Sequence, residues 1–108
     1  MGCSGIEEII AERKLTLLDE SGRTSEVIVR LGKPRMSAEA DDFSCEVHIA
    51  GFNDDKISRI FGLDAFQAIQ LALRYISVSL QLFRERSGQA LYWTSEGDDM
   101  GFPEQPAQ

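Results

Sequence analysis

The chain has 108 residues, of which 43% are hydrophobic and 27% are charged, and its formal net charge is −7 at pH 7. This size suits a single domain, which we expect to span residues 1–108, with a lead-in at 1–10 and an acidic, Gly- and Pro-containing tail at 96–108. The negative charge disfavours nucleic acid and anionic membranes as ligands, because their phosphates would be repelled. A basic protein is the more natural partner, although net charge also serves solubility alone.

The address that the sequence predicts is the cytoplasm. No uninterrupted apolar stretch is long enough to span a bilayer, and no apolar run precedes Cys3 that could form a secretory signal. Cys3 and Cys45 do not have the pattern of a disulfide framework, so we expect a reducing compartment.

Alternating apolar and polar residues predict four β-strands in the first part of the chain. The predicted strands are residues 11–18, 24–31, 43–50 and 56–61. The first two are joined by a polar turn in which Gly22 can adopt a positive φ, so they are expected to form a hairpin. Residues 36–42 are expected to be a polar loop.

A long helix is predicted for residues 65–86. Asp64 is a favourable N-cap residue, Gln67 completes a capping-box pattern, and Gly88 is a C-terminal stop signal. Residues 89–95 then form a last strand. The expected fold is therefore α+β: an antiparallel sheet of about five strands, made of a four-strand meander and a strand after the helix, packed on one long helix.

The helix carries two apolar stripes, although a helix that covers one face of a sheet needs only one. The first stripe is predicted to face the sheet and consists of Phe66, Ile69, Leu73, Ile76, Leu80 and Phe83. The second, which we call the outer stripe, lies nearly opposite and consists of Leu71, Tyr75, Val78 and Leu82. It could be covered by the tail around Met100, Phe102 and Pro103, by a second copy of the chain, or by a different protein.

No catalytic, metal or cofactor site is predicted. His48 is the only histidine, and Cys45 lies three residues away on the same strand and therefore on the opposite face. We interpret Cys45 as a small core residue and His48 as a sheet-surface or partner-contact residue. The basic segment 30–35 lacks any known phosphate-binding pattern, and the adjacent acidic pairs along the chain are more typical of solvated turns than of a metal site.

Acidic residues are concentrated in two segments that contain no Lys or Arg, one between Arg35 and Lys56 and the other after Arg86. If these segments meet in space, they form a negative surface that could steer a basic partner. The residues expected to bind that partner are Glu39, Asp41, Asp42, Glu46, Asp54, Asp55, Asp98 and Asp99.

Four segments, at residues 11–17, 27–34, 62–73 and 101–103, resemble an uncharacterised family of small bacterial proteins. That resemblance covers most of the chain and implies no catalytic residues. In size, charge and α+β build, the chain also resembles the immunity proteins that neutralise bacterial toxins. This second resemblance implies a protein partner with a basic toxin domain.

Three hypotheses follow for the function. The first is a non-catalytic binding protein, in its specific form an immunity protein that blocks a toxin through the acidic surface. The second is a structural or regulatory module that forms a homodimer through the outer stripe. The third, an enzyme, is disfavoured because no nucleophile is placed beside the single histidine. A toxin gene directly upstream would favour the first hypothesis, and a stable dimer without any partner would favour the second.

Overall fold

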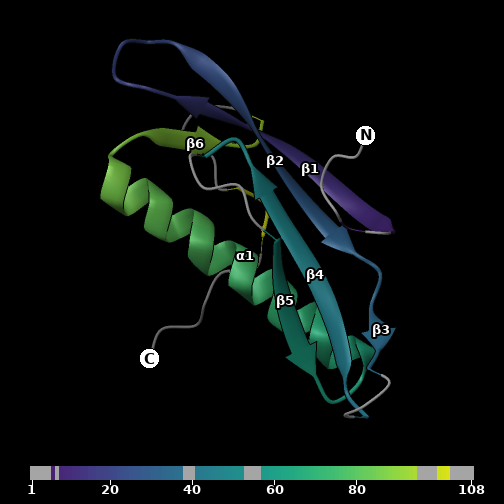
Figure 1. Cartoon of the computed structure of the whole chain (residues 1–108). Helices are drawn as coiled ribbons and strands as arrows, with labels where there is room; N and C mark the ends of the chain where they lie inside the picture. The colour runs from purple at the N-terminus through teal and green to yellow at the C-terminus, as the bar shows by residue number, and fades with distance from the viewer. Residues whose placement is uncertain (1–5, 7, 38–40, 53–56, 95–99, 103–108) are drawn as a thin grey trace.

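The computed structural model describes residues 6, 8–37, 41–52, 57–94 and 100–102. Within these residues one helix lies across one face of a twisted six-stranded sheet (Figure 1). The elements are β1 (Ile9–Leu18), β2 (Thr24–Gly32), β3 (Arg35–Met36), β4 (Phe43–Ala50), β5 (Ile57–Gly62), α1 (Ala65–Ser87) and β6 (Ala90–Tyr92). We call the face turned towards α1 the inner face and the opposite one the outer face.

The long strands form an antiparallel meander in the order β1, β2, β4, β5, and β6 returns after the helix to pair with the free side of β1. The predicted α+β fold with a four-strand meander, a helix and a last strand is thereby confirmed. This order leaves β5 at one edge of the sheet, since the structure pairs it with β4 alone.

Strand β3 was not predicted, because residues 36–42 were expected to be a polar loop. Pro34 has no backbone N–H and cannot donate to the ladder, so the pairing along the side of β4 is interrupted after β2. It resumes when Arg35 pairs with Ser44 and Met36 with Phe43. The short strand β3 therefore continues the line of β2 beyond a proline break.

The turn between β1 and β2 is organised by Asp19. Its carboxylate accepts hydrogen bonds from the backbone N–H and the hydroxyl of Ser21 and from the backbone N–H of Arg23, at 3.0, 2.7 and 2.9 Å. Gly22 has a φ of 87°, as the turn prediction requires. These bonds to the charged form lower the pKa of the Asp19 carboxyl below its ordinary value.

The hydrophobic core lies between the inner face of the sheet and α1. The strands contribute Leu15, Leu17, Val27, Val29, Leu31, Cys45, Val47 and Leu91. Alternate residues in the second half of β1, in most of β2 and in β4 enter this core, which is the alternation that the sequence predicts.

The helix begins and ends where the sequence predicts. The Asp64 carboxylate accepts from the N–H of Gln67 at 2.8 Å, and the Gln67 side chain accepts from the N–H of Leu63 at 2.7 Å. Gly88 ends the helix in the left-handed conformation with a φ of 71°. The Asp64 cap and the Gly88 stop are therefore confirmed.

The buried face of α1 is rotated from its predicted position. The residues closest to the sheet are Ala68, Ala72, Ile76 and Leu80, whereas Ile69, Leu73 and Phe83 pack partly buried beside them. Phe66 was predicted to lie in the core, but its side chain is 79% exposed. The reason is the close approach at Gly62, where an added Cβ would lie 2.4 Å from the Ala68 backbone nitrogen. Small residues must occupy that contact, so the bulky Phe66 is turned away.

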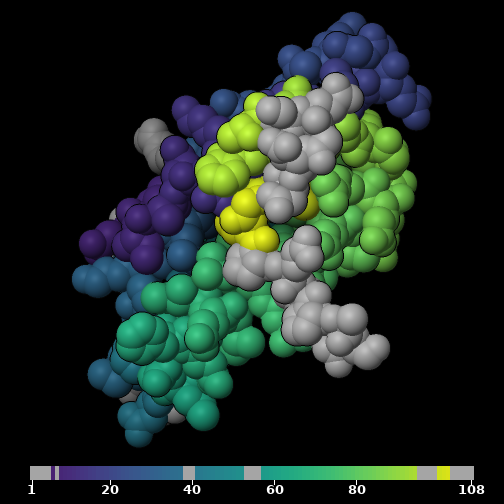
Figure 2. Space-filling model, turned by 180° about the vertical axis from the view of Figure 1, so that it is seen from behind, coloured from purple at the N-terminus to yellow at the C-terminus, as the bar shows by residue number. Residues whose placement is uncertain are grey.

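Residues 100–102 lie on the inner face beside β1, between that strand and α1 (Figure 2). The Arg13 guanidinium stacks over the Trp93 ring at 3.7 Å and over the Phe102 ring at 4.8 Å, and donates to the carbonyl of Gly101 at 2.8 Å. Gly101 has a φ of 80°, and an added Cβ would lie 2.5 Å from both Arg13 and Trp93. Met100 is buried in the core as a result.

Candidate functional site

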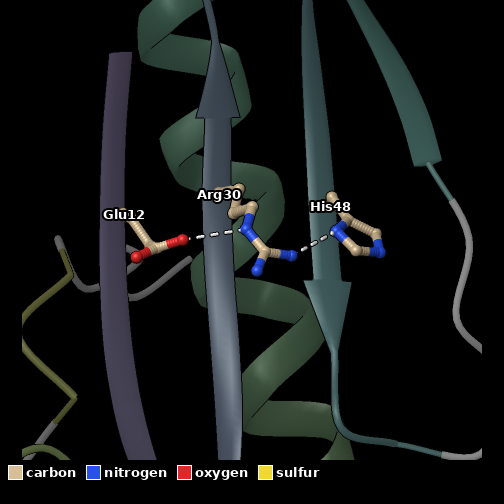
Figure 3. A network of polar contacts seen from close by, with 3 residues as sticks. All are labelled: Glu12, Arg30 and His48. Atoms are coloured by element: carbon tan, nitrogen blue, oxygen red, sulfur yellow. Dashed lines mark hydrogen bonds and ion pairs between the residues drawn. The ribbon is translucent and has the colours of Figure 1, made fainter. Parts of the chain in front are cut away.

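A row of three polar side chains crosses the outer face of the sheet (Figure 3). The row follows from the strand register, in which Glu12 pairs with Arg30 and Arg30 pairs with His48. The Nε of Arg30 donates to the Glu12 carboxylate at 2.9 Å, and Arg30 Nη1 lies 3.1 Å from His48 Nδ1. Arg30 thus joins β1 to β4 across the strand that carries it.

The contact between Arg30 and His48 has a defined direction. Arginine can only donate, so His48 Nδ1 is the acceptor in this contact. His48 lies on the outer face, as predicted, but only 5% of its surface is exposed. Burial leaves little of the His48 ring accessible, and the row links β1, β2 and β4 across the sheet.

Cys45 lies on the inner face and is fully buried, which confirms its prediction as a core residue and its separation from His48. Its thiol donates to the carbonyl of Gly32 at 3.2 Å. Burial raises the pKa of the Cys45 thiol, and the nearby charge of Glu46 raises it further. A buried thiol held in its neutral form is a poor nucleophile.

Two of the three cations in the basic segment at residues 30–35 are paired with carboxylates. Arg30 pairs with Glu12, and Lys33 lies 3.9 Å from the Glu8 carboxylate. Among the described residues there is also no cluster of three or more His, Cys, Asp or Glu side chains that could hold a metal ion.

A groove of about 280 Å³ lies on the inner face between β1, β2, α1 and residues 101–102. Val29, Leu31, Leu73 and Phe102 give it mainly apolar walls. Arg13 also lines it and donates to the carbonyl of Gly101, whereas the Glu12 side chain lies on the outer face, where it pairs with Arg30.

Of the predicted acidic surface, the structure describes Asp41, Asp42 and Glu46. Asp41 is exposed, and its φ is 56°. Asp42 is half-buried, and its Oδ1 atom has no hydrogen-bond partner. Glu46 points to the outer face and pairs with Arg59 at 3.4 Å. The remaining predicted residues, Glu39, Asp54, Asp55, Asp98 and Asp99, lie outside the described residues.

Three exposed apolar side chains belong to segments that meet where α1 begins. Met36, Leu63 and Phe66 are 64%, 80% and 79% exposed. Met36 is in register with Phe43, which is in register with Gly62, and Gly62 contacts the first turn of α1. This arrangement brings the three side chains to one end of the fold, which we call the apolar end.

Exposed carboxylates accompany the apolar end. Asp64 lies between Leu63 and Phe66 in the chain, and Asp41 lies in the loop that connects β3 to β4. Sequence reasoning missed this site, because Phe66 fits the core stripe by spacing. The signal that could have revealed it is a glycine followed by two small residues, with Ala68 six residues after Gly62 and Ala72 four residues after Ala68. Small residues at these positions predict close packing of helix on strand.

The outer stripe lies on the flank of α1 that faces β5. The Tyr75 hydroxyl is 2.7 Å from the Ser58 hydroxyl of β5, whereas the groove beside Leu73 opens towards β1. Tyr75 and Leu82 are exposed, and Leu71 and Val78 are half-buried. Met100 and Phe102 pack on the β1 side of the molecule, so these two tail residues do not cover the outer stripe. Pro103 lies outside the described residues.

Residues 11–104 match a protein family described as a domain of unknown function (DUF6968). No curated protein and no solved structure matches the chain. In the part of the chain that the structure describes, no helix is long and apolar enough to cross a membrane.

Proposed function

We propose that this protein, which belongs to the DUF6968 family, is a non-catalytic binding protein that docks a basic protein at its apolar end. The observation that carries the proposal is the exposure of Leu63 and Phe66, which are 80% and 79% open to solvent at adjacent positions of the fold. Contiguous exposed apolar side chains with a polar rim are typical of contact sites between proteins.

The electrostatic side of the proposal rests on charge. The chain carries a net charge of −7, and the exposed carboxylates Asp41 and Asp64 lie at the same end as the apolar side chains. Opposite potentials accelerate the encounter of two proteins, and the buried centre of the contact then supplies most of the affinity. A basic toxin domain is the specific partner we propose, which would make the protein an immunity protein acting in the cytoplasm.

The experiment is a comparative capture from the native host. The tagged protein and its Leu63→Ser/Phe66→Ser variant are used as baits, and the proteins retained by each are identified. The matched control is Ile10→Ser, which removes an exposed apolar side chain from β1, a strand separated from β5 by β2 and β4.

We expect one basic protein to be retained by the unaltered bait and by Ile10→Ser, and to be lost from Leu63→Ser/Phe66→Ser. The retained protein is then purified and its affinity measured directly with the same three baits. A partner that binds all three equally would place the docking surface elsewhere. A partner with an acidic surface would contradict the electrostatic part of the proposal.

A second candidate function, self-association, is favoured by a different observation. Tyr75 and Leu82 of the outer stripe are 37% and 42% exposed, and Tyr75 lies beside the edge strand β5. We propose it as a separate property of the molecule, since it involves the β5 side of α1 and not the apolar end.

A further inference from the structure

Strand β5 has the arrangement expected of a strand that pairs with a copy of itself. It is a six-residue edge strand paired with β4 on one side, and the structure places no described strand on its other side. Exposed edges are usually protected by proline, by inward-pointing charge or by a covering segment. The β5 sequence Ile-Ser-Arg-Ile-Phe-Gly has no proline, and its one charge points to the outer face, opposite Glu46.

We propose that two copies of the chain associate by antiparallel pairing of β5 with β5 about a two-fold axis at Ile60, which extends the sheet across both copies. This inference rests on the proposed self-association and gives it a geometry. The occupant of the edge is a second copy, because the pattern of side chains along β5 is complementary to itself in one register.

The register follows from the two faces of the sheet. In an antiparallel pair, directly opposite residues point to the same face of the sheet, and successive residues of one strand alternate between the faces. A two-fold axis perpendicular to the sheet must therefore set one residue of β5 directly opposite the same residue of the copy. An axis between two residues would set an inner-face residue opposite an outer-face residue. Axes through Arg59 or Ile60 give the greatest overlap of the strand with its copy. An axis through Arg59 would bring two guanidinium groups directly opposite each other, which is unfavourable.

The axis through Ile60 removes that conflict. It places each Arg59 opposite the partner's Phe61, and both side chains point to the outer face. Phe61 is 52% exposed, and the Arg59 side chain is also largely exposed while it pairs with Glu46. A guanidinium beside an aromatic ring is a favourable contact, and symmetry makes it occur twice.

The outer stripe continues this interface on the inner-face side of the sheet, where α1 lies. Tyr75 is held beside β5 by its contact with Ser58, so the part of the outer stripe around Tyr75 lies along the same edge. When β5 pairs with its copy, the two helices face each other across the axis. Their exposed apolar side chains are then removed from water, which supplies a driving force that the strand pairing lacks.

The first test measures the mass of the purified full chain by sedimentation equilibrium over a range of concentrations. We expect a reversible dimer of the 12.0 kDa chain. Phe61→Lys should weaken it about tenfold, because each lysine would face the partner's Arg59 in two symmetric like-charge pairs. Arg59→Glu combined with Phe61→Lys should restore the dimer, because each glutamate then faces a lysine.

The second test reports the register. Arg59→Cys and Phe61→Cys chains are prepared separately with Cys3 replaced by serine, and are then mixed under mild oxidation. We expect a disulfide between chains in the mixture and none in either variant alone, since position 59 faces position 61 of the other chain. A dimer that fails to cross-link in the mixture overturns this geometry and leaves self-association standing. A chain that stays monomeric at about millimolar concentration, where even weak dimers form, overturns both.

Discussion

At the scale of single residues, carboxylates that accept backbone hydrogen bonds define the ends of elements. Asp64 begins α1, and Asp19 closes the turn between β1 and β2. Both residues are conspicuous in the sequence, because Asp next to a periodic segment is a common N-cap and turn residue.

Replacement of Asp64 by alanine leaves the N–H of Gln67 without its acceptor. We expect Asp64→Ala to lower the free energy of unfolding by about 1 kcal/mol and Asp64→Ser, which can still cap, to lower it by less. Chemical denaturation of the three proteins measures the difference. Equal stability of all three would show that the cap contributes nothing.

The Asp19 carboxyl should make the protein sensitive to acid. Its pKa is lowered in the folded state, so its stabilising effect is present above the pKa of the unfolded chain and is lost as the pH falls through the folded value. The sensitive window therefore lies below about pH 4. We expect carboxyl-resolved NMR titration to give Asp19 a lower pKa than denatured-state aspartate. The Asp19→Asn variant should lose less stability at acid pH than the unaltered protein. An Asp19 pKa at or above the denatured-state value in the unaltered protein would contradict the hydrogen bonds of this turn.

At the scale of elements, the sequence predicts strands and helix well, because alternation and capping are local. Residues 43–50 form β4 as predicted, and α1 extends only one residue beyond the predicted range 65–86. The errors concern how elements meet. The face of α1 that is buried depends on the close approach of Gly62 to Ala68, which hydrophobic spacing alone does not indicate.

The buried line of α1 can be tested directly. Leu80 is fully buried, so Leu80→Ala should lower the free energy of unfolding by about 2–5 kcal/mol. Leu63→Ala removes a side chain that is 80% exposed and should change it by less than about 0.5 kcal/mol. Urea denaturation of both variants provides the measurement. Comparable losses would mean that the helix faces another way.

The attachment of residues 100–102 depends on Arg13. Lysine keeps the charge but lacks the planar group that stacks between Trp93 and Phe102 while it donates to Gly101. We expect Arg13→Lys to cost about 1–3 kcal/mol of stability and to increase Trp93 exposure to a fluorescence quencher. Lys14→Arg, on the exposed outer face, is the matched control and should change neither quantity. Unchanged quenching in Arg13→Lys would show that these residues are held by other contacts.

At the scale of the whole molecule, charge separates the two proposed associations. Each copy carries −7, so copies repel one another and salt should strengthen the homodimer by screening that repulsion. A basic partner is attracted by the same charge, so salt should slow its association. Sedimentation equilibrium of the chain alone at low and high salt tests the prediction for the homodimer. A homodimer that weakens steadily as salt rises would contradict that prediction.

The candidate site could be predicted only in part. The sequence indicates a second apolar surface and an excess of acid, and both are properties of residue types along the chain. It does not indicate that Phe66 and Leu63 are exposed together at one end, because that depends on strand register and on the depth of helix packing. His48 shows the same limit, since alternation places it on the outer face but does not indicate that it is buried there.

The measurement that tests the proposed function most directly is the association rate of the captured partner with the purified protein, followed against salt concentration. We expect the rate to fall steeply as salt rises towards physiological ionic strength, where charges are screened beyond about 8 Å. Leu63→Ser/Phe66→Ser should keep that salt dependence while the complex dissociates faster, because steering and docking reside in different groups. A rate that does not change with salt, together with unchanged dissociation of the variant, would contradict docking of a basic partner at the apolar end.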